Sequence, residues 1–370
     1  MDLPQRDDYQ NILLNDTPLL DVRAPVEFKQ GAFPRARNIP LINDDERHDI
    51  GIRYKNKGQA QAIELGHELV SGKTKEDRVT NWVNFTKENP NGVLYCFRGG
   101  MRSKITQQWI YDNTGIVYPR VKGGYKSMRR YLLEQLDNAA REINAVVLSG
   151  RTGVGKTQLL QSIIAKIDLE EIFHHRGSAF GHHATPQPSQ IDIENDLAIR
   201  ILKLQNEGLN TLVFEDECTS IGSRRIPDSL ITNLKQSSII VLDAPLGERI
   251  EIIYDEYITQ ALSEYQQELG DSAGFEAWSD NLFASLAKIQ RRLGGQHYKS
   301  INSIMDYAVN NHRQSGNPVD HKAWIHDLLV GYYDPMYDYQ LSRKSDRVVF
   351  RGDRQAVLQF LKSSTHSSAK

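Results

Sequence analysis

The stretch "NAVVLSGRTGVGKT", residues 144–157, decides the fold of the second part of this 370-residue chain. It opens with an apolar run typical of a buried strand, and its end matches the pattern G-x-x-x-x-G-K-[ST] in full. Glycines in such a loop free backbone N–H groups to surround a phosphate, the lysine adds a positive charge, and the final hydroxyl can hold Mg²⁺. The predicted phosphate-binding residues are Gly150, Gly153, Gly155, Lys156 and Thr157.

The segments that follow this loop predict an α/β unit with a helical extension. A helix is expected over "QLLQSIIAKI", and two further apolar strands over "NTLVFED" and "SSIIVLDAP". Residues from about 247 to 335 have a mainly helical pattern, after which "DRVVFRG" returns a strand and "DRQAVLQFLK" a last helix. The expected positions are 158–167, 210–216, 237–245, 346–352 and 353–362.

Three acidic residues end the strand "TLVFEDE" and are candidates to hold the magnesium ion. Glu215 directly follows the apolar run, so we select it over Asp216 and Glu217; a solvated acidic turn is the alternative. Arg249 follows "LDAPLGE" and is placed like the lid arginine of P-loop kinases, although a surface salt bridge explains it equally well.

The loop "FHHRGSAFGHHATPQPSQ", residues 173–190, is rich in histidine and glycine. Arg176 and Ser178 could contact a phosphate or substrate, since the glycines allow close approach; a flexible loop is the alternative. Neighbouring histidines point in different directions and no cysteine is near, so we expect no protein-bound metal here.

The first third of the chain alternates strands and helices, which indicates a parallel sheet. "PLLDVR" (18–23) and "GVLYCF" (92–97) are expected strands, and "GIVYPRVKGGY" (115–125) is expected to form a strand followed by a turn. A charged helical stretch, residues 126–142, leads out of this unit, so the boundary is expected near residue 140.

One of the chain's two cysteines, Cys96, ends the strand 92–97 and precedes "FRGGMRS". Two glycines, the start of a helix, and the nearby Arg98 and Arg102 form surroundings that lower the pKa of a thiol. We therefore expect Cys96 to ionise readily and act as a nucleophile, whereas a buried core cysteine is the alternative.

Bulk properties limit the functional classes. The net charge of −2 provides no global positive field for nucleic acid, although local basic patches can suffice. Two cysteines cannot form a secreted disulfide framework, the N-terminus has no signal-peptide pattern, and no apolar run reaches the ~20 residues that span a bilayer. We expect a cytoplasmic protein with no membrane association.

Residues 1 to 130 resemble the rhodanese family. "LLDVRAPVEFKQGAFPRARNIPL" is similar to its N-terminal signature, "CFRGGMRS" to its active-site loop and "VKGGY" to its C-terminal motif. The resemblance implies that Cys96 carries a chalcogen and that Asp21 and Arg23 support the fold behind the loop. Residues 42–80 are longer than a minimal rhodanese needs there.

The order "DDERHDIGIRYKNKG", "CFRGGMRS", "SGRTGVGKT", "HRGSAFG", "FEDECTSIGSRRIP" resembles the tRNA 2-selenouridine synthase family over nearly the whole chain. This implies an α/β fold with a rhodanese-like parallel-sheet domain (1–138), a P-loop NTPase-like domain with a helical C-terminal region (139–362), and a disordered tail (363–370). Cys218 stands where that family more usually has serine, and is expected to be structural.

The resemblance also implies a transferase acting on the wobble uridine of tRNA. Geranyl from geranyl diphosphate would first be attached to the sulfur of 2-thiouridine, and selenium from selenophosphate would then replace the S-geranyl group. Catalysis would rest on Cys96, Arg98 and Arg102 and on the phosphate loop, with Mg²⁺ as an aid and no tightly bound cofactor. An enzyme that supplies selenophosphate could be a partner.

Two alternatives from other classes remain at this point. One is a rhodanese-type sulfurtransferase coupled to an ATP-dependent kinase activity, and the other is a sensor module with an oxidisable Cys96 and a nucleotide switch. Three short basic segments interleaved with tyrosine could form a discontinuous RNA surface, although each is typical of a solvated face. These segments are 126–131, 223–227 and 288–300.

Overall fold

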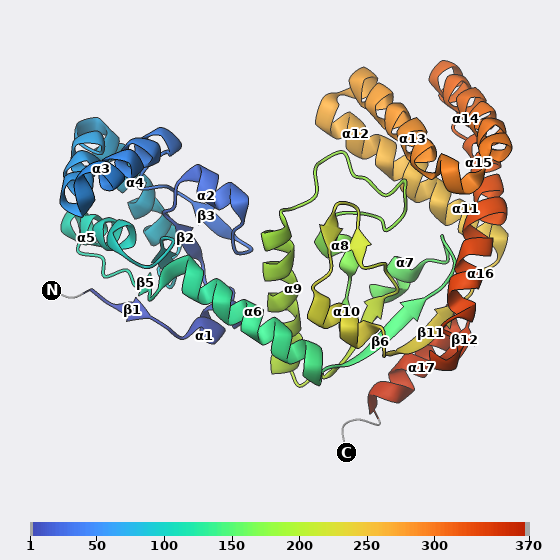
Figure 1. The fold of residues 1–370 in the computed structure, drawn as a ribbon, viewed down its shortest axis with the longest axis horizontal. Helices are drawn as coiled ribbons and strands as arrows, with labels where there is room; N and C mark the ends of the chain where they lie inside the picture. The colour runs from blue at the N-terminus through green and yellow to red at the C-terminus, as the bar shows by residue number, and fades with distance from the viewer. Residues whose placement is uncertain (1–2, 367–370) are drawn as a thin grey trace. The chain divides into compact units, whose positions relative to one another are not determined.

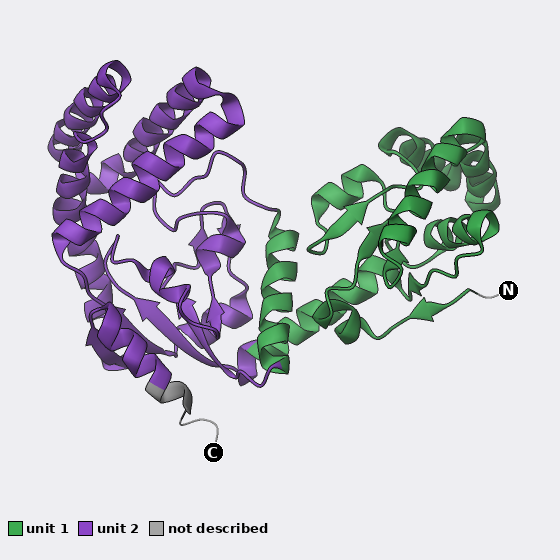
Figure 2. Cartoon of the chain, turned by 180° about the vertical axis from the view of Figure 1, so that it is seen from behind, with its two compact units in different colours: residues 1–139, 189–206 green, residues 140–188, 207–370 purple. Residues whose placement is uncertain are grey.

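The computed structural model describes residues 3–366, which divide into two compact units. Unit 1 comprises residues 1–139 and 189–206, and unit 2 comprises residues 140–188 and 207–370 (Figure 2). Across the described part of the chain, no helix combines the length and apolar character needed to cross a membrane.

Unit 1 is built on a five-stranded parallel sheet with the strand order β1-β5-β4-β2-β3. The strands predicted at 18–23 and 92–97 are confirmed as β2 and β4, which are buried throughout. Only two residues of the stretch 115–125 form a strand, because Gly115 ends a helix, Pro119 has no N–H to donate, and a glycine turn follows. The strands are β1 (Gln5–Arg6), β2 (Leu19–Asp21), β3 (Ala36–Asn38), β4 (Val93–Tyr95) and β5 (Arg120–Val121).

The long segment after β3 forms two helices that the rhodanese-like expectation did not include. The first begins with reciprocal caps: the Asn43 side chain accepts from the Glu46 N–H, and the Glu46 carboxylate accepts from the Asn43 N–H, both at 2.8 Å. It is kinked at Gly58, whose φ is +81°. The helices of unit 1 are α1 (Tyr9–Leu14), α2 (Pro25–Gln30), α3 (Asp44–Leu69), α4 (Gly72–Glu88), α5 (Met101–Thr114), α6 (Gly124–Glu142) and α9 (Gln190–Asn206).

Helix α9 follows the phosphate loop in sequence but packs within unit 1. The Asn195 amide donates to the Ala32 carbonyl, and the Asp192 carboxylate accepts from the Ala32 N–H, each at 2.7 Å. Arg129 of α6 adds a hydrogen bond to the Asn195 side-chain oxygen at 2.7 Å and an ion pair with Glu194. The first unit therefore includes residues beyond the expected range 1–138.

Unit 2 has its own five-stranded parallel sheet, with the order β12-β11-β6-β8-β7. The strand that precedes the phosphate loop, β6, is central, and the expected strands 210–216, 237–245 and 346–352 pair around it. The predicted α/β class with parallel sheets is thus confirmed. The strands of unit 2 are β6 (Asn144–Ser149), β7 (Lys166–Ile167), β8 (Thr211–Glu215), β11 (Ser238–Leu242), β12 (Val348–Gly352) and the separate hairpin β9 (Ser220–Ile221) and β10 (Arg224–Arg225).

The helix expected over 158–167 is wrong beyond Leu160. Helix α7 ends there, and Lys166–Ile167 instead form the edge strand β7 on β8. Ile167 is fully buried in this strand, a position that suits a β-branched side chain.

The helices from α11 to α16 form a group of their own in unit 2, drawn in yellow to red in Figure 1. Their shared core includes Trp278, Leu286, Met305 and Trp324, which agrees with the helical pattern predicted for 247–335. The helices of unit 2 are α7 (Lys156–Leu160), α8 (Leu169–Phe173), α10 (Asp228–Leu234), α11 (Leu246–Tyr254), α12 (Ala261–Leu269), α13 (Asp271–Leu293), α14 (Gly295–Ser315), α15 (His321–Leu328), α16 (Asp334–Ser342) and α17 (Arg354–His366), with π-helical segments η1 (Asp255–Gln260) and η2 (Leu329–Tyr333) and a 3₁₀ turn η3 (Ser345–Arg347).

Helix α17 includes the first residues of the segment 363–370, for which the sequence predicts disorder. The last four residues of that segment, 367–370, lie outside the described residues.

Candidate active sites

The phosphate loop lies between β6 and α7, so its backbone follows the carboxyl end of the central strand. Gly153 has φ +79°, and a Cβ atom there would lie 2.8 Å from the Ile253 side chain and 2.9 Å from the Arg249 carbonyl oxygen. Only glycine therefore fits at this position. The loop lines a small pocket of about 40 Å³ with residues from α8, the histidine loop, α11–η1 and α16.

The acidic side chain that meets the phosphate loop is Glu215, at the end of β8. One of its oxygens accepts from the Thr157 hydroxyl at 3.0 Å, and the other accepts from the Glu170 N–H at 3.1 Å. Asp216, by contrast, accepts from Ser149 at 2.6 Å and from Lys344 at 2.8 Å. Of the three acidic candidates, the structure thus brings Glu215 to the hydroxyl of the loop.

Three carboxyl groups crowd around Lys156. Burial raises the pKa of Glu170, Glu215 and Glu217 to about 8 each, and their mutual repulsion adds to the increase. Burial lowers the pKa of Lys156, but Tyr337 and these carboxyl groups outweigh it and hold the pKa above its ordinary value. The pocket therefore combines a lysine that stays protonated with three carboxyl groups whose ionised forms an added cation would stabilise.

The raised pKa values predict a pH-dependent stability. Between pH about 4.5 and about 8, the unfolded chain ionises these glutamates while the folded protein keeps them protonated, so the unfolded state binds fewer protons. The free energy of unfolding should thus fall as the pH rises through this window. The neutral isostere Glu217→Gln should reduce the slope of melting temperature against pH.

The exposed Glu268→Gln is the matched control, and its slope should equal that of the wild type. A Glu217→Gln slope equal to the wild-type slope would contradict the placement of this carboxyl group. Millimolar Mg²⁺ should also flatten the wild-type slope, because it favours the ionised carboxylates.

Arg249 on α11 is buried, and its guanidinium is fully engaged. It pairs with Asp334 of α16 through contacts of 2.9 and 2.5 Å and donates to the carbonyl of Thr152 in the phosphate loop at 2.9 Å. The side chain therefore fixes the loop backbone and joins it to α16. A role as a lid arginine stays a prediction.

Arg249→Met should lower the free energy of unfolding of unit 2 by about 3 kcal/mol, because it leaves the half-buried Asp334 carboxylate with only the longer contact to Arg151, at 3.7 Å. Urea unfolding followed by tryptophan fluorescence can report this loss, since Trp278 and Trp324 lie in the core of this unit. Arg351→Met removes an exposed pair with Asp243 and is the control, with an expected loss below about 1 kcal/mol. Equal losses in the two variants would contradict the assignment.

Arg176 and Ser178 both line the phosphate-loop pocket. Arg176 forms an ion pair with Glu264, and the Ser178 hydroxyl lies 2.8 Å from the Tyr257 hydroxyl. Both side chains therefore have protein partners, and their contact with a ligand stays a prediction.

The four histidines of this loop form two ring pairs. His174 stacks on His183 at 4.1 Å between ring centroids, and His175 meets His182 edge-on at 4.8 Å. Burial lowers the pKa of His175 to about 4, so this ring stays neutral. Among residues 3–366, no group of three or more His, Cys, Asp or Glu side chains has an arrangement that could hold a metal ion by itself.

Cys96 directly follows β4 in unit 1 and is buried. Its sulfur donates to the Ser103 hydroxyl at 3.3 Å, and this hydroxyl donates to the Gly100 carbonyl at 3.1 Å. The stretch that begins α6 closes the loop from the other side: a Cβ atom at Gly124, where φ is +62°, would lie 2.3 Å from the Cys96 carbonyl oxygen. The sequence motifs "CFRGG" and "VKGGY" are therefore packed backbone to backbone.

The two arginines of the cysteine loop differ in their surroundings. Arg98 is exposed, whereas Arg102 forms a two-pronged ion pair with Glu27 of α2, at 2.5 and 3.0 Å. Burial alone would raise the pKa of Glu27, but this pair holds it below its ordinary value. Arg102 thus links the helix after Cys96 to α2, and Arg98 is available to an incoming anion.

Asp21 and Arg23 lie behind the cysteine loop. Both are buried, and the Arg23 guanidinium donates to Asp21 at 2.6–3.0 Å. The same guanidinium lies 3.8 Å from the centre of the Tyr125 ring, which stacks on Phe97 of the loop. This arrangement fits the supporting role that the rhodanese resemblance implies.

Some residues and one cavity of the candidate sites are not indicated by any sequence motif. Glu170 and Tyr337 line the phosphate-loop pocket although neither is near the loop in sequence. Helix α3 forms one wall of a cavity of about 940 Å³ in unit 1, the α3 cavity, which also includes Arg98 and Arg102. In the sequence, only the unusual length of residues 42–80 indicates an additional structural feature in this region.

The three basic segments have different surroundings. In the first, Arg129 is bonded to α9, and in the second, Arg224 donates to the Pro188 carbonyl at 2.7 Å. Arg291 and Arg292 of the third are exposed on α13.

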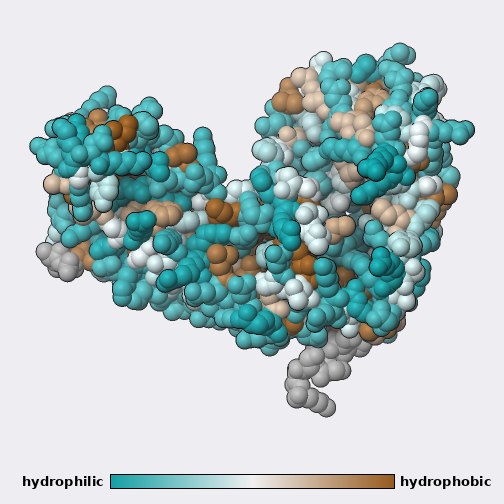
Figure 3. Space-filling view, in the orientation of Figure 1, coloured by the Kyte–Doolittle hydropathy of each residue, from teal (hydrophilic) through white to brown (hydrophobic). Residues whose placement is uncertain are grey.

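On the face drawn in Figure 3, hydrophobic residues form small groups within a largely hydrophilic surface.

Comparisons with known proteins identify relatives of the whole chain. Residues 143–368 match the family model described as the tRNA 2-selenouridine synthase AAA domain. Three curated relatives are each named tRNA 2-selenouridine synthase. The one from Marinobacter nauticus is 45% identical over 98% of both chains, and the one from Sulfurovum sp. is 45% identical over 98% of this chain and 99% of the relative. The one from Hahella chejuensis is 47% identical over 98% of this chain and 96% of the relative.

Proposed function

The chain belongs to the tRNA 2-selenouridine synthase family, and we propose that it converts 2-thiouridine at the wobble position of tRNA to 2-selenouridine by way of S-geranyl-2-thiouridine. It is an enzyme that modifies tRNA, and its co-substrates would be geranyl diphosphate and selenophosphate. The observation that carries this proposal is the span of the similarity. It covers 98% of the chain and so includes both the cysteine loop and the phosphate loop.

Geranyl transfer is assigned to unit 2. The sulfur of 2-thiouridine would attack the first carbon of the geranyl chain, the bond from this carbon to the diphosphate oxygen would break, and the N3 proton of the base would be released. Negative charge develops on the departing diphosphate. Lys156 and the backbone N–H groups of residues 150–157 are arranged to stabilise this charge.

Mg²⁺ fits the oxygen-rich part of this pocket. Mg²⁺ prefers carboxylate and hydroxyl oxygens and usually binds through one or two carboxylates together with substrate phosphates. The Thr157 hydroxyl and the Glu215 carboxylate would hold it, and their present contact at 3.0 Å puts both beside the loop. When bound, the ion would supply further positive charge to the diphosphate.

The selenium step is assigned to unit 1. Cys96 would act there as a thiolate or as a carrier of selenium, and Arg98 offers an exposed positive charge for the phosphate group of selenophosphate. The rhodanese resemblance of this unit supports the assignment, because strand β4 of the parallel sheet ends just before Cys96 and the "VKGGY" stretch packs against the cysteine loop. An enzyme that supplies selenophosphate is a candidate partner, and the cytoplasm is the expected site of action.

The proposal is tested by adding the co-substrates in turn. Purified protein is mixed with tRNA that contains 2-thiouridine and with geranyl diphosphate, selenophosphate is then added, and the nucleosides are analysed by mass spectrometry after each addition. We expect S-geranyl-2-thiouridine first and 2-selenouridine second. No modified nucleoside at either stage, with tRNA of verified 2-thiouridine content, would overturn the proposal.

The same samples distinguish the proposed function from the alternative, a sulfurtransferase coupled to a kinase. A sulfurtransferase coupled to a kinase would hydrolyse or consume ATP without tRNA. Phosphate release from ATP at a rate independent of tRNA, together with unmodified nucleosides, would favour that function instead.

A further inference from the structure

A second cavity of unit 2 adjoins the phosphate-loop pocket. It has a volume of about 700 Å³, and we refer to it as the α16 cavity because α16 and the preceding η2 line one side. It shares Gly177, Ser178, Glu217 and Tyr337 with the phosphate-loop pocket. A ligand whose phosphates lie in the loop can therefore extend directly into this space.

The deep part of the α16 cavity is apolar. Ile226, Ile231 and Ile289 are buried, and Leu234 and Met336 are partly buried. These side chains come from α10, α13, α16 and the turn before α10, so the apolar wall is formed by several elements. Such a wall binds a hydrocarbon chain through the removal of apolar surface from water.

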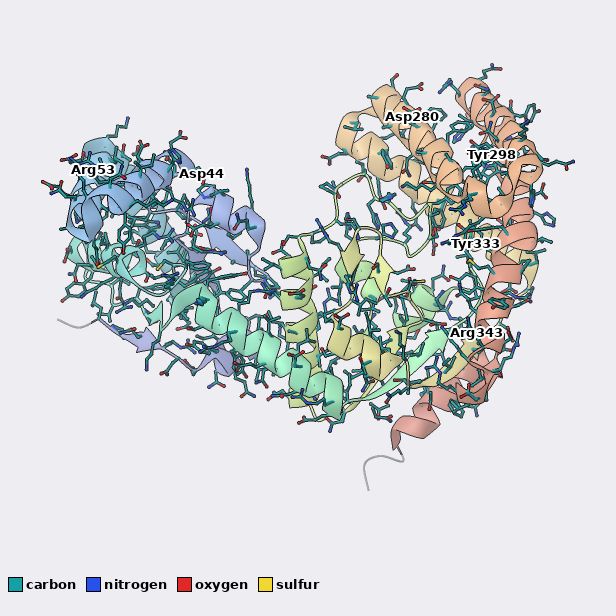
Figure 4. All side chains as sticks on the ribbon, viewed as in Figure 1. Asp44, Arg53, Asp280, Tyr298, Tyr333 and Arg343 are labelled. Atoms are coloured by element: carbon teal, nitrogen blue, oxygen red, sulfur yellow. The ribbon has the colours of Figure 1, made fainter. Side chains whose placement is uncertain are left out.

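The outer part of the cavity is basic. Arg292 of α13 and Arg343 after α16 are exposed, and neither makes an ion pair with another residue of the described range 3–366. Figure 4 labels Arg343 and Tyr333, two lining residues that lie on either side of α16 in sequence. The opening therefore suits an approaching nucleic-acid backbone, while the interior suits an apolar group.

Two other cavities do not combine these features. The small cavity next to Phe180 and Trp324 also adjoins the phosphate loop, but its volume is only about 20 Å³. The α3 cavity is large and partly apolar, but its lining belongs to unit 1 and includes no residue of the phosphate loop.

We propose that the α16 cavity binds the prenyl chain of an allylic diphosphate whose phosphate groups lie in the loop 150–157. This rests on the proposed use of geranyl diphosphate in unit 2. Tyr337 and Ser178 line the passage between the two spaces, so the reacting carbon would lie near them. The volume falls within the ~300–1,000 Å³ of pockets that enclose a drug-sized ligand, which leaves room for the base as well as for the chain.

The test is a comparison of two ligands that differ only by the chain. Binding of geranyl diphosphate and of inorganic pyrophosphate is measured by calorimetry, with Mg²⁺, for the wild type and for Met336→Trp. We expect the wild type to bind geranyl diphosphate more tightly than pyrophosphate. Met336→Trp fills the cavity and should reduce the affinity for geranyl diphosphate by about tenfold or more, with that for pyrophosphate unchanged.

Ile52→Trp is the matched control, because Ile52 lines the α3 cavity of unit 1. It should bind both ligands as the wild type does. If Met336→Trp also loses pyrophosphate binding, Leu234→Phe on α10 makes the same test with a smaller change.

The outcomes separate this assignment from the function on which it rests. Equal wild-type affinities for the two ligands would overturn the cavity assignment alone. The same holds if Ile52→Trp loses the preference for geranyl diphosphate while Met336→Trp and Leu234→Phe keep it. Failure of the wild type to bind either ligand would overturn the proposed role of the phosphate loop and the cavity assignment together.

Discussion

Replacing Lys156 with alanine is expected to slow geranylation of tRNA by about 100- to 1,000-fold, the usual effect of removing one group that stabilises developing negative charge. Its ammonium group is the positive charge held among Glu170, Glu215 and Glu217, and its pKa is raised above the ordinary value, so it is charged at any working pH. Without it, the departing diphosphate would face the carboxyl groups alone. Initial rates from nucleoside mass spectrometry, with geranyl diphosphate in excess, measure the effect.

Lys166→Ala is the control for Lys156→Ala, because it removes a lysine of the same unit that lies on the edge strand β7, outside the phosphate-loop pocket, and donates to Gln161. Its geranylation rate should stay near that of the wild type. A Lys156→Ala rate within about threefold of the wild type would show that the diphosphate is stabilised elsewhere, since one charge-assisted contact is worth more than this.

Cys96→Ser is expected to abolish the selenium step and to leave geranylation largely intact. A serine hydroxyl is not ionised near neutral pH and is a poor nucleophile, whereas a thiol supplies a reactive thiolate. The change is small, and Ser103 can bond to a hydroxyl as it does to the sulfur, so the fold should persist. Conversion of tRNA that already carries S-geranyl-2-thiouridine to 2-selenouridine should fall below detection.

The second cysteine provides the matched control for this variant. Cys218 is exposed in unit 2, and Cys218→Ser should convert the geranylated tRNA at the wild-type rate. Unchanged selenation in Cys96→Ser would remove the carrier role from Cys96. Loss of both steps would instead indicate that Cys96 supports the fold of the chain.

Most of the fold could be predicted wherever a strand has a continuous apolar run. Residues 92–97, 144–150 and 237–245 are such runs, and each contains the observed strand to within a few residues. The helix predicted over 158–167 is wrong, because apolar residues spaced as in a helix there form a short helix and then an edge strand. Periodicity alone does not separate these outcomes in a short apolar segment.

The candidate sites could be located from the sequence where their residues are contiguous. The phosphate loop and the cysteine loop are of this kind, and Glu215 could be chosen because a parallel strand brings its last residue to the same edge as the loop. Glu170 and Tyr337 could not be found, because they reach the pocket only through the packing of α8 and α16. The partners of Arg249 and Arg102, which decide how free their charges are, likewise depend on tertiary contacts.

The placement of α9 has a consequence for how the chain can be divided and inherited. The helix is encoded after the phosphate loop, yet its Asp192 and Asn195 satisfy both backbone groups of Ala32. A fragment that ends at residue 138 would leave these groups without their α9 partners, and a fragment that starts at 139 would carry α9 without the backbone groups of Ala32. Recombination between relatives can therefore exchange a complete first unit only if residues 189–206 travel with it.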